Sequence, residues 1–293
     1  MTICGEERRM AKIAVITDTD SSLPFDVAER HGVVQVPISI RFGNETYRDG
    51  YDIDAAAVFA RVDHEGSLPQ TAAPSPGEFA SAFEGALAGG AEAILCLNIS
   101  SEVSGTCDAA RLAAREFEGR EITVVDTRQL SMSQGFMVLA AARAAAQGAT
   151  VEQALAAAMA TGERAHLFGA LSTLKYLALG GRVSQFAAMA GNVLSIRPIL
   201  TVRDGKLDLL EKSRTRKRAW ARVIDLATER LNGCSPQQLA VLHAAAPDAA
   251  SEFEAEVRAS LSCPASIMIC ELMPGLSVHT GSGMVGIAFV TPD

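Results

Sequence analysis

Long apolar runs are missing from this sequence of 293 residues, and so is an excess of basic charge. No unbroken apolar stretch reaches the roughly 18 to 20 residues that a helix needs to span a bilayer. The start, MTICGEERRMAKIAVITD, lacks a basic segment followed by an apolar h-region, so we expect a cytoplasmic protein without stable membrane insertion. The net charge of −8 speaks against nucleic acid as a partner, because neutralising phosphates takes a basic surface.

Aromatic residues are scarce at 5%, and the six cysteines form no CxxC pair and have no histidine at metal-ligand spacing. Several of the cysteines lie inside apolar runs. We therefore expect small buried thiols, with neither disulfides nor a metal site. The remaining composition, 48% hydrophobic and 20% charged, is typical of a soluble globular protein.

The usual catalytic and nucleotide-binding signatures are also absent. The sequence has no GxGxxG after its first apolar run and no GxxxxGK[ST], so nucleotide binding has little support. A GxSxG nucleophile elbow is missing as well. Ser104, in VSGT, is a candidate nucleophile for acyl hydrolysis or transfer, but no histidine and acid can be assigned to it by spacing.

The first half of the chain alternates short β-branched runs with helical stretches. We predict strands over residues 12–18, 33–40, 93–99 and 121–127, with helices between them. Strands that alternate with helices predict a mostly parallel sheet flanked by helices, with ligands bound at the carboxyl ends of the strands.

The second half changes character after a helix predicted over 151–165. The stretch ILTVRDGKLDLLEK has DG between two alternating runs, which predicts a hairpin. Further helices and strands follow, so we expect an α+β unit with antiparallel pairing. The length is about twice that of a usual domain, and we predict an N-terminal α/β domain over 12–168 and a C-terminal α+β domain over 169–293.

Three loops rich in hydroxyl groups stand at the ends of predicted strands or before predicted helices. They are TDTDSSLP (17–24), LPQTAAPSPGEF (68–79) and ISSEVSGT (99–106). If they meet at one edge of the sheet, hydroxyls and helix N-terminal N–H groups would form an anion site. The other interpretation is plain N-capping, because Ser, Thr and Asp begin helices whether or not a ligand is present.

Two further features attract attention. His279 lies among small residues in SVHTGSGMVG, where it is either a turn histidine or a partner for an acidic ligand. Residues 212–222, KSRTRKRAWAR, hold six basic residues in eleven, against the acidic remainder. On a helix, Arg214, Lys217 and Arg218 would share one face, which is either a solvated face or a surface for an acidic partner.

Taken together, the motifs resemble the DegV family of bacterial fatty-acid-binding proteins, from Lys12 to the C-terminus. The first eleven residues have no counterpart and are expected to be an N-terminal extension. The matching stretches, in the family's order, are KIAVITDTDSSLP, VPISIRFGNETYRDG, TAAPSPGEF, ISSEVSGT, VVDTRQLSMSQG, LKYLALGGRVS, IRPILTVRDGKLDLLEKSRTRKRA and SVHTGSGMVGIAF.

The resemblance implies a two-domain α/β fold of the DegV-like (EDD) type that buries a long-chain fatty acid such as palmitate between its domains. It also implies that Thr71 and Ser104 hold the carboxylate and that His279 lies near it. By the same resemblance, Arg182 and Arg214 face a dihydroxyacetone-kinase-like fatty-acid kinase that converts the bound acid to an acyl-phosphate. The chain is then a carrier with no ATP site, no cofactor and no enzymatic activity of its own.

The acyl chain would supply most of the affinity. A sixteen-carbon chain buries on the order of fifteen methylenes at about 0.8 kcal/mol each, far more than two hydrogen bonds worth about 1 kcal/mol apiece. We therefore expect an apolar tunnel, to which residues 167–179 and 183–200 are the expected contributors, and a polar end that sets the ligand's orientation.

Overall fold

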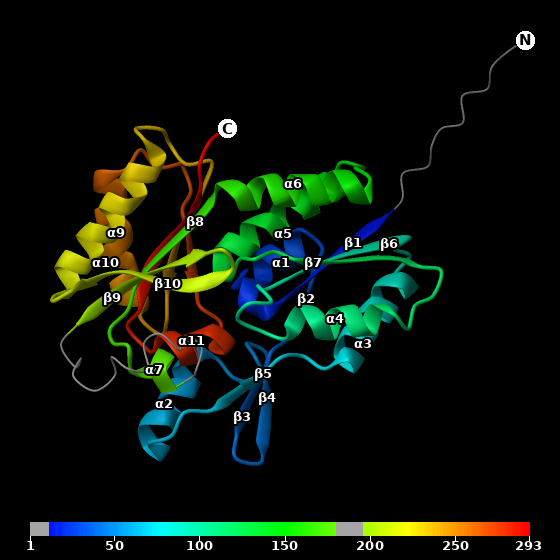
Figure 1. Cartoon of the computed structure of the whole chain (residues 1–293), viewed down its shortest axis with the longest axis horizontal. Helices are drawn as coiled ribbons and strands as arrows, with labels where there is room; N and C mark the ends of the chain where they lie inside the picture. Colours follow the sequence, from blue (N-terminus) through cyan, green and yellow to red (C-terminus); the bar gives the residue numbers. More distant parts are fainter. Residues whose placement is uncertain (1–11, 180–195) are drawn as a thin grey trace, which may run out of the picture.

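The computed structural model describes residues 12–179 and 196–293, whose strands form sheets of four, six and three strands. The two larger sheets stand side by side with helices around and between them, and the smallest lies below them in the view of Figure 1. The parallel pairing in the first part of the chain and the second sheet in the later part confirm the expected α/β fold class.

The four-stranded sheet is parallel throughout, in the order β2-β1-β6-β7. Its strands are β1 (Ile13–Asp18), β2 (Val33–Val36), β6 (Ala93–Asn98) and β7 (Glu121–Asp126). Three of the four strands predicted here are confirmed. The strand predicted over 33–40 is wrong in length, because Pro37 has no N–H for the ladder and β2 ends just before it.

The six-stranded sheet has the order β10-β9-β8-β13-β11-β12 and is antiparallel except between β11 and β12. Its strands are β8 (Ala165–Ala170), β9 (Arg197–Arg203), β10 (Lys206–Ser213), β11 (Gln238–His243), β12 (Met268–Glu271) and β13 (Val285–Val290). The predicted hairpin is confirmed: Asp204 and Gly205 join β9 to β10 with φ of +52° and +80°, as a type I′ turn requires. The boundary expected after residue 168 falls inside β8, and the division into two domains stays a prediction.

A small third sheet was not expected from the sequence. It consists of β4 (Glu45–Arg48), β3 (Ser39–Phe42) and β5 (Gln70–Ala72), all antiparallel. Because β2 leads directly into β3, this sheet lies beyond the carboxyl ends of the parallel strands. Its apolar side chains pack against α2 (Ala55–Glu65) and α11 (Pro274–Thr280).

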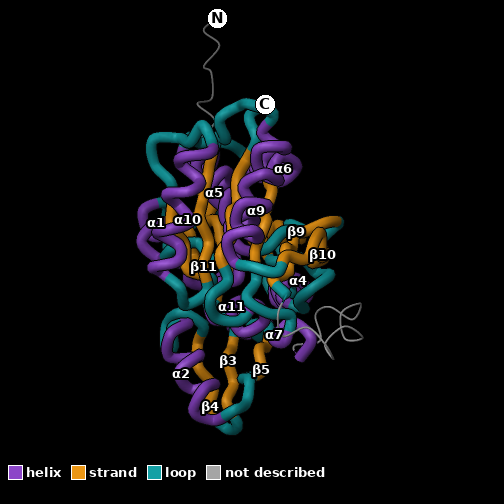
Figure 2. Tube along the Cα trace, turned by 90° about the vertical axis from the view of Figure 1, so that its left-hand side faces the viewer, coloured by secondary structure: helices purple, strands orange, loops and turns teal. Residues whose placement is uncertain are grey.

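Helices cover the outer faces of the two large sheets and fill the space between them (Figures 1 and 2). The helices α3 (Pro76–Ala88) and α4 (Thr106–Ala114) cover the parallel sheet, whereas α9 (Arg216–Leu231) and α10 (Pro247–Ser260) cover the six-stranded one. Between the sheets, α5 (Ser131–Ala146) packs on β1 and β13 with α6 (Val151–Arg164) beside it. The other described helices are η1 (Thr19–Ser21, 3₁₀), α1 (Phe25–Arg30) and α7 (Lys175–Leu179).

The central helix α5 explains why both sheets share a core. Its first nine residues are all buried, as expected of a helix that is apolar or small on every side and has sheets on two sides. Phe136 of this helix, Leu95 of β6 and Leu242 of β11 belong to one continuous hydrophobic cluster. The two large sheets are therefore held together by burial of apolar surface from both of them.

Three local expectations need correction. His279 lies in the last turn of α11 and not in a turn, because Pro274 begins a helix that continues to Thr280. Arg214 precedes Thr215, the residue that caps α9, so it does not share a helical face with Lys217 and Arg218. Three cysteines are buried as expected, but Cys234 is exposed because it follows the end of α9 on the surface; Cys4 lies outside the described residues.

Candidate functional site

A set of mostly apolar side chains surrounds a cavity between the two large sheets and α11. The cavity has a volume of about 850 Å³, counted with the part that is open to solvent. Most of its lining residues are aliphatic, and the six-stranded sheet supplies four of them: Leu167, Leu200, Leu207 and Leu242. Leu171 and Leu177 line it too, so the stretch 167–179 contributes as predicted, while residues 183–195 of the other predicted stretch lie outside the described residues.

One end of the cavity is polar. Thr71 on β5 and His279 on α11 both line it, and their Oγ1 and Nε2 atoms are 3.1 Å apart. Both residues also line a hollow on the outer surface, next to Leu68 and Leu179. The Thr71–His279 pair therefore lies where the cavity meets the surface, and we call this region the mouth.

Strand pairing explains how Thr71 comes to face the mouth. Strand β5 pairs with β3 so that Thr71 is opposite Ile40, which is buried in the cluster beneath α11. Ser75, four residues later, has a different role: its side chain and that of Glu78 form a capping box at the start of α3. The capping interpretation of this loop thus applies to Ser75, whereas Thr71 lies on a strand and is not at a helix end.

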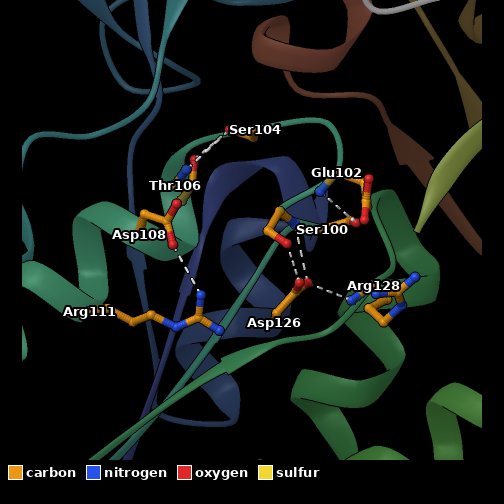
Figure 3. A network of polar contacts seen from close by, with 9 residues as sticks. Ser100, Glu102, Ser104, Thr106, Asp108, Arg111, Asp126 and Arg128 are labelled. Atoms are coloured by element: carbon orange, nitrogen blue, oxygen red, sulfur yellow. Dashed lines mark hydrogen bonds and ion pairs between the residues drawn. The ribbon is translucent and has the colours of Figure 1, made fainter. Parts of the chain in front are cut away.

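The loop between β6 and α4 carries Ser104 (Figure 3). Ser104 lines the same cavity, as do the polar residues Asp20, Ser131 and Thr280. Its Oγ lies 2.8 Å from Oγ1 of Thr106 and accepts a hydrogen bond from the Thr106 N–H. Ser101 instead bonds through its N–H and its hydroxyl to Asp126 at the end of β7. The hydroxyl oxygen of Ser100 accepts a hydrogen bond from the Glu102 N–H. Of the hydroxyl residues in this loop, Ser104 is the one that faces the cavity, and the others shape the loop.

The Ser104 loop is also attached to the hairpin of the second sheet. Lys206, at the start of β10, lies 3.3 Å from a carboxylate oxygen of Glu102 in the loop. Arg128, beside the loop in Figure 3, donates a hydrogen bond to the backbone oxygen of Asp204 in the hairpin turn. The side of the cavity that carries Ser104 is therefore held by contacts from both large sheets.

Three carboxyl groups are buried near the cavity: Asp20 lines it, and Asp49 and Asp18 bond to the backbone of two lining residues, Gly275 and Ile99. The sequence analysis named Asp18 and Asp20 only as part of the loop 17–24. Asp49 accepts hydrogen bonds from Thr19 Oγ1 (2.5 Å) and the Gly275 N–H (3.1 Å), so it ties α11 to η1. Burial raises the pKa of Asp49 to about 7. Asp18, whose pKa burial raises to about 6, accepts from the Ile99 N–H at 2.8 Å. The run of polar residues where a strand ends, as in TDTD, was the available signal for Asp18, the last residue of β1, whereas nothing local marked Asp49.

The two arginines expected to face a partner have different outcomes. Arg182 lies outside the described residues. Arg214 is exposed and, with Arg218, lines a surface hollow that is distinct from the cavity. Arg216 and Arg222, by contrast, are engaged by carboxylates of α10 and of β10 and α9.

The geometry gives no support to the alternative of a serine nucleophile. In the described part of the chain the Ser104 hydroxyl is hydrogen-bonded to Thr106, and no histidine or carboxylate is bonded to it. Over residues 12–179 and 196–293, no group of three or more His, Cys, Asp or Glu side chains is arranged to hold a metal ion. In the same ranges, none of the helices has the length and apolar character needed to cross a bilayer.

Comparison with known proteins gives consistent results across the chain. The model of a family described as uncharacterised protein, DegV family, matches residues 12–292. A DegV domain-containing protein of Streptomyces coelicolor is 35% identical over 277 residues, which cover 94% of this chain and 97% of that relative.

Solved structures show the same similarity. A DegV family protein of Thermus thermophilus, described by its fatty acid binding, superposes with a TM-score of 0.87 at 31% identity and covers 96% of this chain and 100% of its own. A fatty acid (stearic acid)-binding protein of Eubacterium ventriosum superposes with a TM-score of 0.84 at 26% identity, covering 96% of this chain and 98% of its own.

Proposed function

The chain belongs to the DegV family, and from this premise we propose that it binds a long-chain fatty acid in the cavity. The acyl chain would lie along the leucines between the two large sheets, and the carboxylate would lie at the mouth. The observation that carries the proposal is one cavity that joins an aliphatic interior to Thr71, Ser104 and His279. The fatty acids described for the Thermus and Eubacterium proteins support it.

The cavity suits a carboxylate because three separate segments supply polar groups to its lining: β5 and α11 at the mouth, and the loop between β6 and α4. The hydroxyl of Ser104 can donate to a carboxylate, and so can the hydroxyl of Thr71 when its oxygen accepts from the Nε2–H of His279. Hydrogen bonds to an ionised acceptor are roughly twice as strong as those between neutral groups. Donors of this kind fix the position of the head, whereas burial of the acyl chain supplies most of the free energy of binding.

We further propose that the protein presents the bound acid to a dihydroxyacetone-kinase-like fatty-acid kinase. Because the hydrogen-bonded pair Thr71 and His279 lines the outer hollow as well as the cavity, a carboxylate bound to this pair would be accessible from the surface. A carboxylate oxygen would attack the γ-phosphorus of ATP held by the kinase, which gives an acyl-phosphate and ADP. In this reaction the chain acts as a carrier, and Arg214 together with Arg182 would contact the kinase.

Mass spectrometry of lipid extracted from the purified protein tests the binding step. We expect a long-chain fatty acid at about one per chain, and the delipidated protein should take up added palmitate. Recovery of no acyl chain together with no uptake of palmitate would refute the proposal.

The kinase step is tested with Arg214→Glu, which should lower kinase-dependent formation of acyl-phosphate and leave the lipid content unchanged. Arg115→Glu is the matched control, since Arg115 is exposed at the end of α4, on the opposite outer layer. Equal rates for the two variants would exclude Arg214 from the kinase contact. Loss of lipid from Arg214→Glu would instead assign Arg214 to the fold or to the cavity.

A further inference from the structure

The cavity-facing side of the six-stranded sheet has a gap in its middle. Strand register places Gly169 of β8 between Leu200 of β9 and Gly286 of β13, and Gly286 is opposite Leu242 of β11. The two leucines line the cavity, but the glycines between them have no side chains. The row therefore forms a hollow two residues wide, with a leucine on either side.

The side chain of Met284 lies over this hollow. A Cβ atom placed on Gly169 would be 2.6 Å from the Met284 Cε, and one placed on Gly286 would be 3.0 Å from the same atom. Neither glycine has the positive φ that would require glycine for the backbone. At Gly286 a Cβ would also meet the backbone of β8, but at Gly169 its nearest neighbours are the side chains of Met284 and Leu171. Gly169 therefore provides space for Met284.

Met284 itself lines the cavity. It is 3% exposed and precedes β13, where its side chain is on the same face as Gly286. Methionine is unbranched and has three rotatable side-chain bonds, so it adapts to the shape of its neighbours more readily than leucine does. Glycine in the interior of a strand weakens the sheet, so sheet stability does not explain Gly169. The space that it leaves for Met284 does.

We propose that Met284, seated over Gly169 and Gly286, sets the width of the cavity at this row and so determines which acyl chains fit. The proposal rests on the proposed fatty-acid binding and refines its ligand class. A straight saturated chain has the same width along its length, whereas a cis double bond or a methyl branch needs extra width at one point. Because the Met284 side chain lies in the hollow over Gly169 and Gly286, the cavity is wide enough at this row for such a non-linear chain.

Two substitutions should change this selectivity in opposite directions. Met284→Ala leaves the hollow open, so the preference for a cis-unsaturated over a saturated chain should rise. Gly169→Ala adds a methyl group where the Met284 Cε now lies and forces that side chain toward the cavity, so the preference should fall. Each change should be about fourfold, which corresponds to the burial of one methylene group.

The experiment measures Kd values of palmitate and of its cis-monounsaturated analogue of equal length for the delipidated full chain. Gly162→Ala is the matched control: a Cβ on Gly162 would be 2.8 Å from Cε of Met137, the same kind of contact, but Met137 does not line the cavity. The control should leave the ratio of the two Kd values unchanged.

An unchanged ratio in Met284→Ala, with both acids still bound, overturns the role of Met284 and leaves fatty-acid binding intact. Failure of the wild-type protein to bind either acid refutes the proposed function itself, so the two failures are distinguishable. If Gly169→Ala does not fold, Met284→Ala decides the question, with Met284→Leu as a second variant that retains bulk but not flexibility. An equal shift with Gly162→Ala would also overturn the proposal, because it would trace the effect to general loosening of the core.

Discussion

At the scale of single residues, the loops near the cavity carry hydroxyl groups that have different local roles but look alike in sequence. Ser75 caps a helix, Ser101 binds Asp126, and Ser104 and Thr71 face the cavity. All four are hydroxyl residues in loops or at strand ends, so composition alone could not separate them. Only the spatial neighbours of each side chain decide which of them can reach a ligand.

The double variant Thr71→Ala, Ser104→Ala tests the two hydroxyls that line the cavity. Loss of two hydrogen bonds should weaken fatty-acid binding by about 2 kcal/mol or more, with the fold retained. The Kd of palmitate and the far-UV circular dichroism of the variant are the measurements. Thr228→Ala with Ser251→Ala is the control, because these hydroxyls bond to carbonyls of their own helices, α9 and α10. Unfolding of the first pair would show that its hydroxyls are structural.

Asp49 makes the stability of the protein depend on pH. Burial raises its pKa from an ordinary 3.8 to about 7, so the folded state retains a proton that the unfolded chain releases. The contribution of this proton to stability is complete below about pH 4 and is lost as the pH rises through 7. The free energy of unfolding should therefore fall over this range, by at most about 1.4 kcal/mol per pH unit for one proton.

Asp49→Asn should flatten this pH dependence, since an amide does not titrate and its oxygen can still accept from the Gly275 N–H. Denaturant unfolding at several values between pH 4 and 8 measures the slope. Asp18 and Glu271, whose pKa values burial also raises, and the histidines whose pKa burial lowers account for the slope that remains. Asp52→Asn is the control: hydrogen bonds from Arg48 hold the pKa of Asp52 at about 2, so its carboxylate stays ionised throughout. An Asp49→Asn slope equal to that of the wild type would contradict the assignment.

At the scale of elements, the sequence predicted those strands and helices whose pattern is local. The alternation around β1, β6 and β7 and the DG turn between β9 and β10 were sufficient. The small third sheet was missed because its strands are short and its pairing of β3 with β5 joins segments about 30 residues apart. The helical setting of His279 was missed because α11 is only seven residues long and rich in small residues.

Helix α3 allows capping to be separated from ligand binding. Ser75→Ala should lower the free energy of unfolding by about 1 kcal/mol, because it removes the side chain that accepts from the Glu78 N–H. Thr150→Ala removes the equivalent capping box from α6, and it should lower the free energy of unfolding, measured with denaturant, by a similar amount. Both variants should keep their bound lipid. Release of lipid by Ser75→Ala alone would place Ser75 in the binding site.

At the scale of the whole molecule, the family could be recognised from ordered motifs, but the lining of the cavity could not be predicted. Leu200, Gly169, Gly286 and Leu242 form one row only because four strands pair in a particular register. This register cannot be read from the spacing of residues along the chain, because β8 and β13 are more than 100 residues apart. Resemblance therefore gave the expectation of a tunnel, whereas strand pairing determines its shape.

A ligand in this cavity should stabilise the molecule as a whole, because the cavity wall includes side chains from both large sheets and from α11. Palmitate at about 100 times its Kd adds about 2.7 kcal/mol to the free energy of unfolding, provided that the unfolded chain does not bind it. For a chain of 293 residues, whose entropy of unfolding is about 0.6 kcal/mol/K, that corresponds to a rise of about 4 °C in Tm. Differential scanning calorimetry of the delipidated protein with and without palmitate measures this shift.

Methyl palmitate separates the contribution of the acyl chain from that of the charged head. It retains all the methylenes but offers no carboxylate to Thr71, Ser104 and His279, so it should raise Tm by less than palmitate at the same concentration. Because most of the binding energy comes from the chain, its effect should still be clearly above zero. An equal rise for ester and acid would mean that the mouth does not recognise the carboxylate, and no rise for either would mean that the cavity does not hold an acyl chain.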